Sequence, residues 1–93
     1  MSETFDLEDF SMIDMNAKKV LVALSESGKG IFVKGEEIHK KTGLVPADIN
    51  ESVKSLAKSL LVDVPGNLQG LPPYDFYGVE ITDFGRQVLE AYG

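Results

Sequence analysis

Two helical patterns separated by a very short connection set the tightest limit on how this chain folds. Residues 36–42 place acids first and lysines last, an order that suits the helix dipole at both ends. Gly43 can take the left-handed conformation that ends a helix, and Pro46 suits the first position of the next one. A second helix is predicted over residues 46–60. Its apolar stripe consists of Ile49, Val53, Leu56 and Leu60.

The same kind of pattern predicts another helix before this pair and one after it. The first spans about residues 14–27, begins at Asp14 or Asn16, and stops at the glycines that follow. The last spans residues 83–92, with Thr82 as its cap. The apolar positions of the first are Ala17, Val20, Leu21 and Leu24, and those of the last are Phe84, Val88, Leu89 and Tyr92.

Three short segments have the composition of strands. Residues 31–33, 61–64 and 79–82 are rich in β-branched and aromatic residues, so we expect a small antiparallel sheet. A long loop, residues 65–77, separates the last two segments and contains three prolines and no basic residue. The predicted fold is therefore mainly α with a small antiparallel β unit, in the order α-β-α-α-β-β-α.

The residue types present exclude several kinds of site. The chain has 93 residues, 43% of them hydrophobic, which is enough for one domain with a small core, predicted over residues 13–93. It has no cysteine, so disulfide scaffolds, zinc–cysteine clusters and thiol nucleophiles are ruled out. Its single histidine, His39, offers neither a polyhistidine metal site nor a serine-type triad. We therefore expect no catalytic activity, no metal and no cofactor.

Location follows from the beginning of the chain and from its longest apolar run. Residues 1–12 form an acidic arm, the opposite of a basic targeting peptide. The longest purely apolar run covers only residues 20–24, far too short to span a bilayer. We expect a cytoplasmic protein that does not bind membranes.

Net charge argues against indiscriminate binding to nucleic acid, but its distribution is uneven. The whole chain carries −6, with nine basic and fifteen acidic residues. Residues 1–28 and 61–93 each carry −4, whereas residues 29–60 carry +2. Salt limits the reach of exposed charges to about 8 Å, so a basic segment can act on phosphates despite acids elsewhere. Ordinary scatter in charge is the simpler alternative.

Three segments resemble the winged helix-turn-helix superfamily of transcription regulators. They are residues 35–44, residues 53–62, and the run Val79-Glu80-Ile81-Thr82-Asp83-Phe84-Gly85-Arg86. The last is similar to the Leu-Thr-x-x-Gly-Arg pattern that follows the wing in many such regulators. The resemblance covers residues 14–92 and implies a three-helix core beside a small sheet. It also implies that the second helix of the pair lies in the DNA major groove.

If double-stranded DNA is the ligand, the helix over residues 46–60 supplies the base contacts. Asparagine can pair bidentately with adenine and lysine can donate to guanine, so Asn50 and Lys54 are the predicted base readers. The predicted phosphate contacts are Lys34, Lys40, Lys41 and Lys58. The alternative is that these lysines are ordinary solvated residues on two exposed helix faces.

Two departures from DNA-binding members of the family favour a different function. The wing loop, residues 65–77, carries Asp75 where such members usually have arginine or lysine, and Asp48 and Glu51 lie near the start of the helix over residues 46–60. The alternative hypothesis is a protein interaction module that uses the uncharged aromatic wing loop and the acidic arm. Its predicted contacts, to a protein partner or to a second copy in a homodimer, are Tyr74, Phe76, Tyr77, Phe5 and Phe10.

Two further possibilities remain open at this stage. Phe76 can instead fold back onto the domain and bind nothing. The acidic arm can also mimic or shield a nucleic-acid site on a partner. A two-fold dimer would place two copies of the helix over residues 46–60 on adjacent turns of the major groove.

Overall fold

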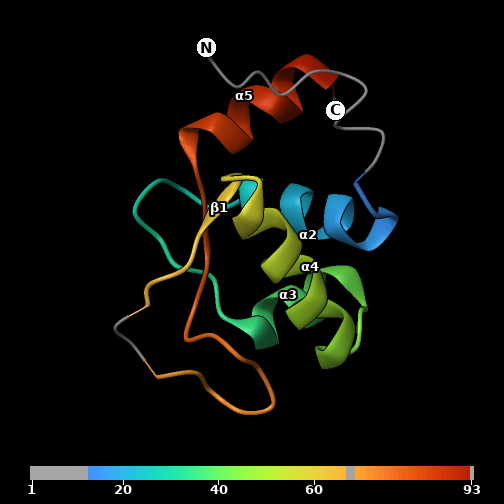
Figure 1. Cartoon of the computed structure of the whole chain (residues 1–93), viewed down its shortest axis with the longest axis vertical. Helices are drawn as coiled ribbons and strands as arrows, with labels where there is room; N and C mark the ends of the chain where they lie inside the picture. The colour runs from blue at the N-terminus through green and yellow to red at the C-terminus, as the bar shows by residue number, and fades with distance from the viewer. Residues whose placement is uncertain (1–12, 67–68, 93) are drawn as a thin grey trace.

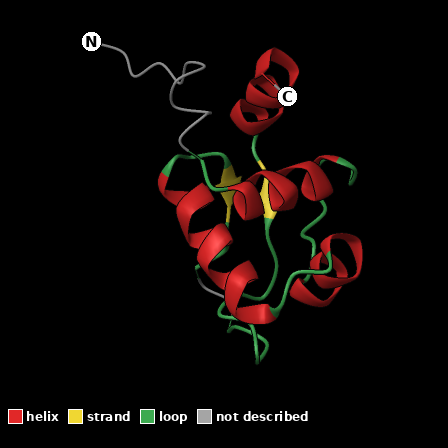
Figure 2. Cartoon of the chain, turned by 90° about the vertical axis from the view of Figure 1, so that its right-hand side faces the viewer, coloured by secondary structure: helices red, strands yellow, loops and turns green. Residues whose placement is uncertain are grey.

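The chain is mainly helical with a small two-stranded antiparallel sheet (Figure 1). The computed structural model describes residues 13–66 and 69–92. Within this part, the elements in chain order are α2 (Met15–Ser25), α3 (Gly35–Thr42), α4 (Pro46–Lys58), β1 (Val62–Asp63), β2 (Glu80–Ile81) and α5 (Asp83–Tyr92). In both Figure 1 and Figure 2, α5 lies at one end of the molecule and the loop before β2 at the other.

Most helix ends follow the predicted signals. The Asp14 carboxylate accepts a hydrogen bond from the Asn16 N–H at 3.1 Å and caps α2. Gly43 ends α3 in the left-handed conformation, with a φ of 76°. Pro46 is the first residue of α4. The helix predicted over residues 83–92 is confirmed with the same bounds.

The sheet is smaller than the sequence predicts. Val62 pairs with Ile81 and Asp63 with Glu80, so β1 and β2 have two residues each. The segment predicted as a strand over residues 31–33 contributes one bridge, in which Val33 and Val79 exchange hydrogen bonds of 2.8 and 2.9 Å. The segment around Val33 therefore flanks β2 on the side opposite β1.

One continuous core joins all these elements. Helices α2, α3 and α4 bury their apolar stripes against one another, and the sheet closes the core from the side. The fully buried large side chains are Val20, Leu21, Leu24, Ile38, Ile49, Leu56, Leu61 and Val79. Burial of a leucine or isoleucine side chain contributes about 1.5–3 kcal/mol, so this set supplies much of the stability.

Leu60 is the clearest error in the predicted core. The helix predicted over residues 46–60 ends at Lys58, and Leu60 takes a left-handed φ of 63° that turns its side chain outward, where it is 71% exposed. The next residue, Leu61, is fully buried in its place. A left-handed backbone conformation costs a residue with a Cβ about 1–2 kcal/mol, so Leu60 is strained at this position.

Helix α5 is held by three residues of the run from Val79 to Arg86. The Thr82 hydroxyl donates to the Leu60 carbonyl oxygen at 2.9 Å and accepts from the Gly85 N–H at 2.9 Å. The Arg86 guanidinium donates to the carbonyl oxygens of Ser25 and Ser27, at 3.2 and 2.8 Å. These carbonyls lie at the end of α2, where a cation is favoured by the helix dipole. The run thus joins α5 to the sheet and to α2.

Candidate nucleic-acid interface

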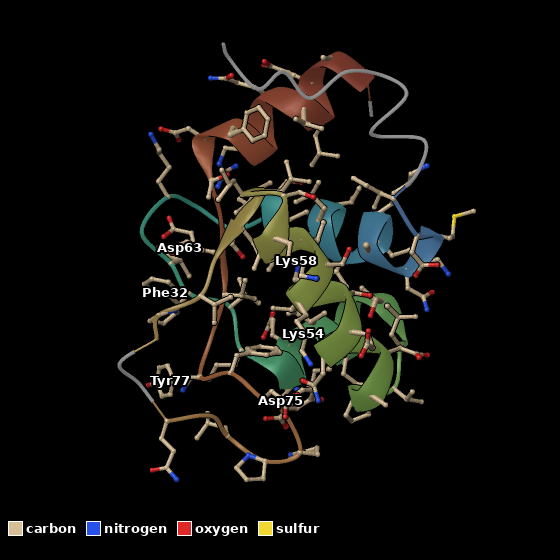
Figure 3. All side chains as sticks on the ribbon, in the orientation of Figure 1. Phe32, Lys54, Lys58, Asp63, Asp75 and Tyr77 are labelled. Atoms are coloured by element: carbon tan, nitrogen blue, oxygen red, sulfur yellow. The ribbon has the colours of Figure 1, made fainter. Side chains whose placement is uncertain are left out.

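Helix α4 presents a polar face to solvent on the side opposite its buried stripe. Ile49, Val53 and Leu56 pack into the core, whereas Lys54, Ser55 and Lys58 are exposed. Figure 3 shows Lys54 and Lys58 on the same side of α4, with Asp75 beyond Lys54. The two lysines lie in the second half of the helix and the acids Asp48 and Glu51 in the first half. The charge on this face therefore changes sign along α4.

The turn between α3 and α4 is fixed by local hydrogen bonds. The His39 ring joins the Leu44 carbonyl oxygen through Nδ1 at 2.7 Å, so Nδ1 carries the proton. The Thr42 hydroxyl donates to the Ile38 carbonyl oxygen and accepts from the Leu44 N–H, at 2.7 and 3.1 Å. These bonds hold the three-residue connection and so set the direction in which α4 leaves α3.

The predicted phosphate-binding lysines are divided among different parts of the surface. Lys41 forms an ion pair of 3.1 Å with Glu26 and lines a groove between α2 and α3. Lys34 and Lys40 line one separate hollow, which is formed by residues 27–40 and includes no residue of α4. Lys34 lies over the Tyr77 ring, 5.1 Å from its centroid, a cation–π contact. Of the six predicted DNA contacts, Lys54 and Lys58 are thus the two exposed together on α4.

Asn50, predicted as a base reader, is engaged by the wing loop. Its side-chain nitrogen donates to the Pro73 carbonyl oxygen at 3.2 Å, and its side-chain oxygen accepts from the Asp75 N–H at 3.0 Å. A bidentate contact with adenine needs the same donor and the same acceptor. In this structure Asn50 therefore holds the wing loop against α4. The sequence shows only a polar residue at a helical surface position and carries no signal of this contact.

An Asn50→Ala variant should loosen the wing loop without unfolding the domain. It removes two hydrogen bonds, each worth about 0.5–1.5 kcal/mol, so we expect a loss of about 1–2 kcal/mol in the free energy of unfolding. Amide hydrogen exchange at Asp75 should accelerate more than exchange at Leu56 in the core. Unchanged exchange at Asp75 would contradict the assigned role.

The aromatic residues of the wing loop are mostly used internally. Phe76 is 4% exposed and belongs to the core, so its ring folds back onto the domain, as one of the two alternatives from the sequence describes, and offers little surface to a partner. Tyr74 packs against the core, and its ring fills the space that a side chain on Gly35 would need. Tyr77 contacts Lys34. Phe5 and Phe10 lie outside the described residues.

Sequence reasoning missed an exposed apolar pair beside the wing loop. Ile31 is 54% exposed and Phe32 is 38% exposed. The sequence predicts a strand over residues 31–33, and a strand of three residues gives too little alternation to show which side chains face solvent. The Phe32 Cβ lies 3.0 Å from the position that a Cβ on Gly78 would occupy, so Phe32 packs beside the end of the wing loop.

Three comparisons with known proteins found no match. No protein-family model, curated protein or solved structure matches the chain. Within the described ranges, no group of three or more histidine, cysteine or acidic residues is arranged to hold a metal ion. None of the helices in that part of the chain has the length and apolar character needed to cross a membrane.

Proposed function

We propose that this protein is a winged helix-turn-helix regulator that binds double-stranded DNA through α4. The α2–α3–α4 core and the three-residue turn support the proposal. The arrangement of the segment around Val33, β2 and β1 beside that core also supports it. The observation that carries it is the pair Lys54 and Lys58, which lie on the same side of α4 and are both exposed among the described residues (Figure 3).

In this mechanism the second half of α4 enters the major groove, which is wide enough to admit a helix. Lys54 donates to a guanine edge, and Lys58 contacts the phosphate backbone. Lys34, beside the wing loop, supplies a second phosphate contact. Asn50 acts as a brace that sets the distance between α4 and the wing loop, because its amide is already bonded to that loop. The acids Asp48, Glu51 and Asp75 keep the first half of α4 away from phosphates.

A fluorescence titration with mixed-sequence duplex DNA at about 50 and about 200 mM salt tests the proposal. The two phosphate contacts, from Lys58 and Lys34, predict a log–log slope near −1.8, and hence an affinity about 12-fold weaker at the higher salt. Lys58→Ala should weaken all sequences alike and reduce the slope by about 1, whereas Lys54→Ala should relax sequence preference.

Lys29→Ala is the matched control, since Lys29 is an exposed lysine paired with Asp83 at the start of α5. It should leave the affinity for DNA unchanged. If the wild-type protein shows no salt-dependent binding at tens of micromolar DNA, the DNA function fails. Equal loss in all three lysine variants would contradict the separate roles given to Lys54 and Lys58.

The second candidate function is a protein interaction module, and the exposed pair Ile31 and Phe32 favours it. Figure 3 shows Phe32 on the same side of the molecule as Tyr77 and the acid Asp63, and Ile31 is its exposed neighbour in the chain. Aromatic residues are enriched in interface cores. This function predicts binding to a protein and no change in any property on addition of DNA.

A further inference from the structure

The end of α4 places a leucine where the backbone favours glycine. The Leu60 N–H donates to the Ala57 carbonyl oxygen and the Leu61 N–H to the Leu56 carbonyl oxygen, both at 3.0 Å. This pair of bonds is the Schellman motif, whose left-handed position is usually glycine because a Cβ is strained there. Leu60 has a φ of 63° at that position. The Leu60 backbone thus completes the end of α4, but the Cβ of its side chain is strained in that conformation.

The Leu60 side chain is also exposed, so the core does not explain it. Its exposed fraction of 71% is the largest among the exposed large apolar residues of the described chain. Strain together with apolar exposure is a double cost that a glycine would remove at once. Because packing among the described residues leaves this side chain exposed, a contact with another molecule is a physical reason for a leucine here.

Acidic groups surround Leu60. It borders a hollow of about 370 Å³ that is lined by Lys29, Leu60, Val62, Asp63, Glu80, Ile81, Thr82 and Asp83. The hollow contains three acids and one lysine, and this lysine is paired with Asp83 at 3.1 Å. We call this region the Leu60 face. Its negative charge repels phosphate groups of DNA or of a membrane, so an apolar and basic protein surface is the matching occupant.

The groove between α2 and α3 has the complementary character. It has a volume of about 430 Å³ and is lined by Lys18, Lys19, Val22, Ala23, Glu26, Lys41 and Thr42. Val22 is 46% exposed and, with Ala23, supplies apolar surface in this groove. The charges mirror those of the Leu60 face, with three lysines against one acid.

We propose that Leu60 of one molecule docks in the α2–α3 groove of a second copy of this chain. In this contact the leucine covers the apolar surface at Val22, and the acids of the Leu60 face meet the lysines of the groove, which include Lys19. The two surfaces are different parts of the chain, so the contact is head-to-tail and leaves a free Leu60 face and a free groove at the two ends. Neither surface includes Lys54 or Lys58, so the contact does not depend on the proposed DNA binding.

Sedimentation of the full chain, from tens to hundreds of micromolar, tests the contact. Small interfaces are weak, so we expect the apparent mass to rise with concentration and to pass the mass of a dimer. Leu60→Gly should abolish this rise and should raise the melting temperature, which shows that the variant is folded. Lys19→Glu should also abolish it. Ile31→Ala removes another exposed apolar side chain, 54% exposed and outside both surfaces, and should behave like the wild type.

Mixing the two inactive variants tests the direction of the contact. Leu60→Gly keeps an intact groove and Lys19→Glu keeps an intact leucine, so the mixture should form one-to-one pairs although neither variant associates alone. The proposal is overturned by a wild-type protein that stays monomeric, or by association that persists in Leu60→Gly. A mass that levels off at a dimer, as in a two-fold arrangement, also overturns it.

Discussion

A Gly85→Ala variant is expected to lose about 3 kcal/mol in the free energy of unfolding. A Cβ at this position would lie against the Leu61 carbonyl oxygen, closer than atoms can approach, and 2.7 Å from the Ile81 Cγ1 atom. A backbone carbonyl cannot rotate away as a flexible side chain can, so α5 or the end of α4 must shift. Overpacking of this kind costs about 1–3 kcal/mol. The shift also strains the hydrogen bonds that Thr82 makes to Leu60 and Gly85.

Urea denaturation followed by circular dichroism measures this loss, and Gly28→Ala provides the control. A Cβ on Gly28 would meet only the Ile31 Cδ1 atom, at the ordinary distance of 3.8 Å, and Gly28 does not have a positive φ. Gly28→Ala should therefore change stability by no more than about 1 kcal/mol, in the stabilising direction, because alanine restricts the unfolded chain. If both variants were equally stable, close packing at Gly85 would not be the reason for the glycine.

The fold was predictable where the signal is local. Capping by Asp14, the left-handed Gly43 and the first-turn Pro46 depend on residues within one helical turn, and the structure has all three. Leu60 shows where such signals fail, because helical spacing marks it as core although the helix ends two residues earlier. Two leucines, Leu60 and Leu61, follow the end of α4, and the sequence does not reveal which of them enters the core and which takes the left-handed position.

The candidate site was less predictable because it depends on contacts between distant segments. Asn50 and Asp75 are 25 residues apart, and only the folded wing loop brings the Asp75 N–H to the Asn50 side chain. Phe76 enters the core from the same loop, which has no periodic pattern that distinguishes its buried ring from its exposed neighbours. The sequence shows which residues are lysines, but it does not show which surfaces they share. Their distribution over different surfaces follows from how α2, α3 and α4 pack together.

An Arg86→Met variant is expected to show the second large effect, a loss of about 3 kcal/mol. Methionine keeps the apolar stem but removes the donors that reach the carbonyl oxygens of Ser25 and Ser27. Hydrogen bonds from a charged donor are worth about 1.5–3 kcal/mol each, and the freed carbonyls recover part of that loss from water. Lys29→Ala is the control, because it breaks the exposed ion pair with Asp83 and should cost no more than about 1 kcal/mol.

A double variant that combines Gly85→Ala with Arg86→Met tests whether the two residues act together to hold α5 in place or stabilise the protein independently. Gly85 places α5 against the end of α4 and the sheet, and Arg86 fastens it to α2, so a helix already displaced by Gly85→Ala has less to lose from Arg86→Met. We therefore expect the double variant to lose about 1–3 kcal/mol less than the two single losses added together. Strict additivity would mean that each residue acts locally.

Arg86 donates to carbonyl oxygens at the end of α2 and not to α4, so folded molecules of Arg86→Met should keep the wild-type affinity for DNA below their melting temperature. A loss of that affinity in the folded variant would indicate that the run from Val79 to Arg86 contributes to DNA binding as well as to stability.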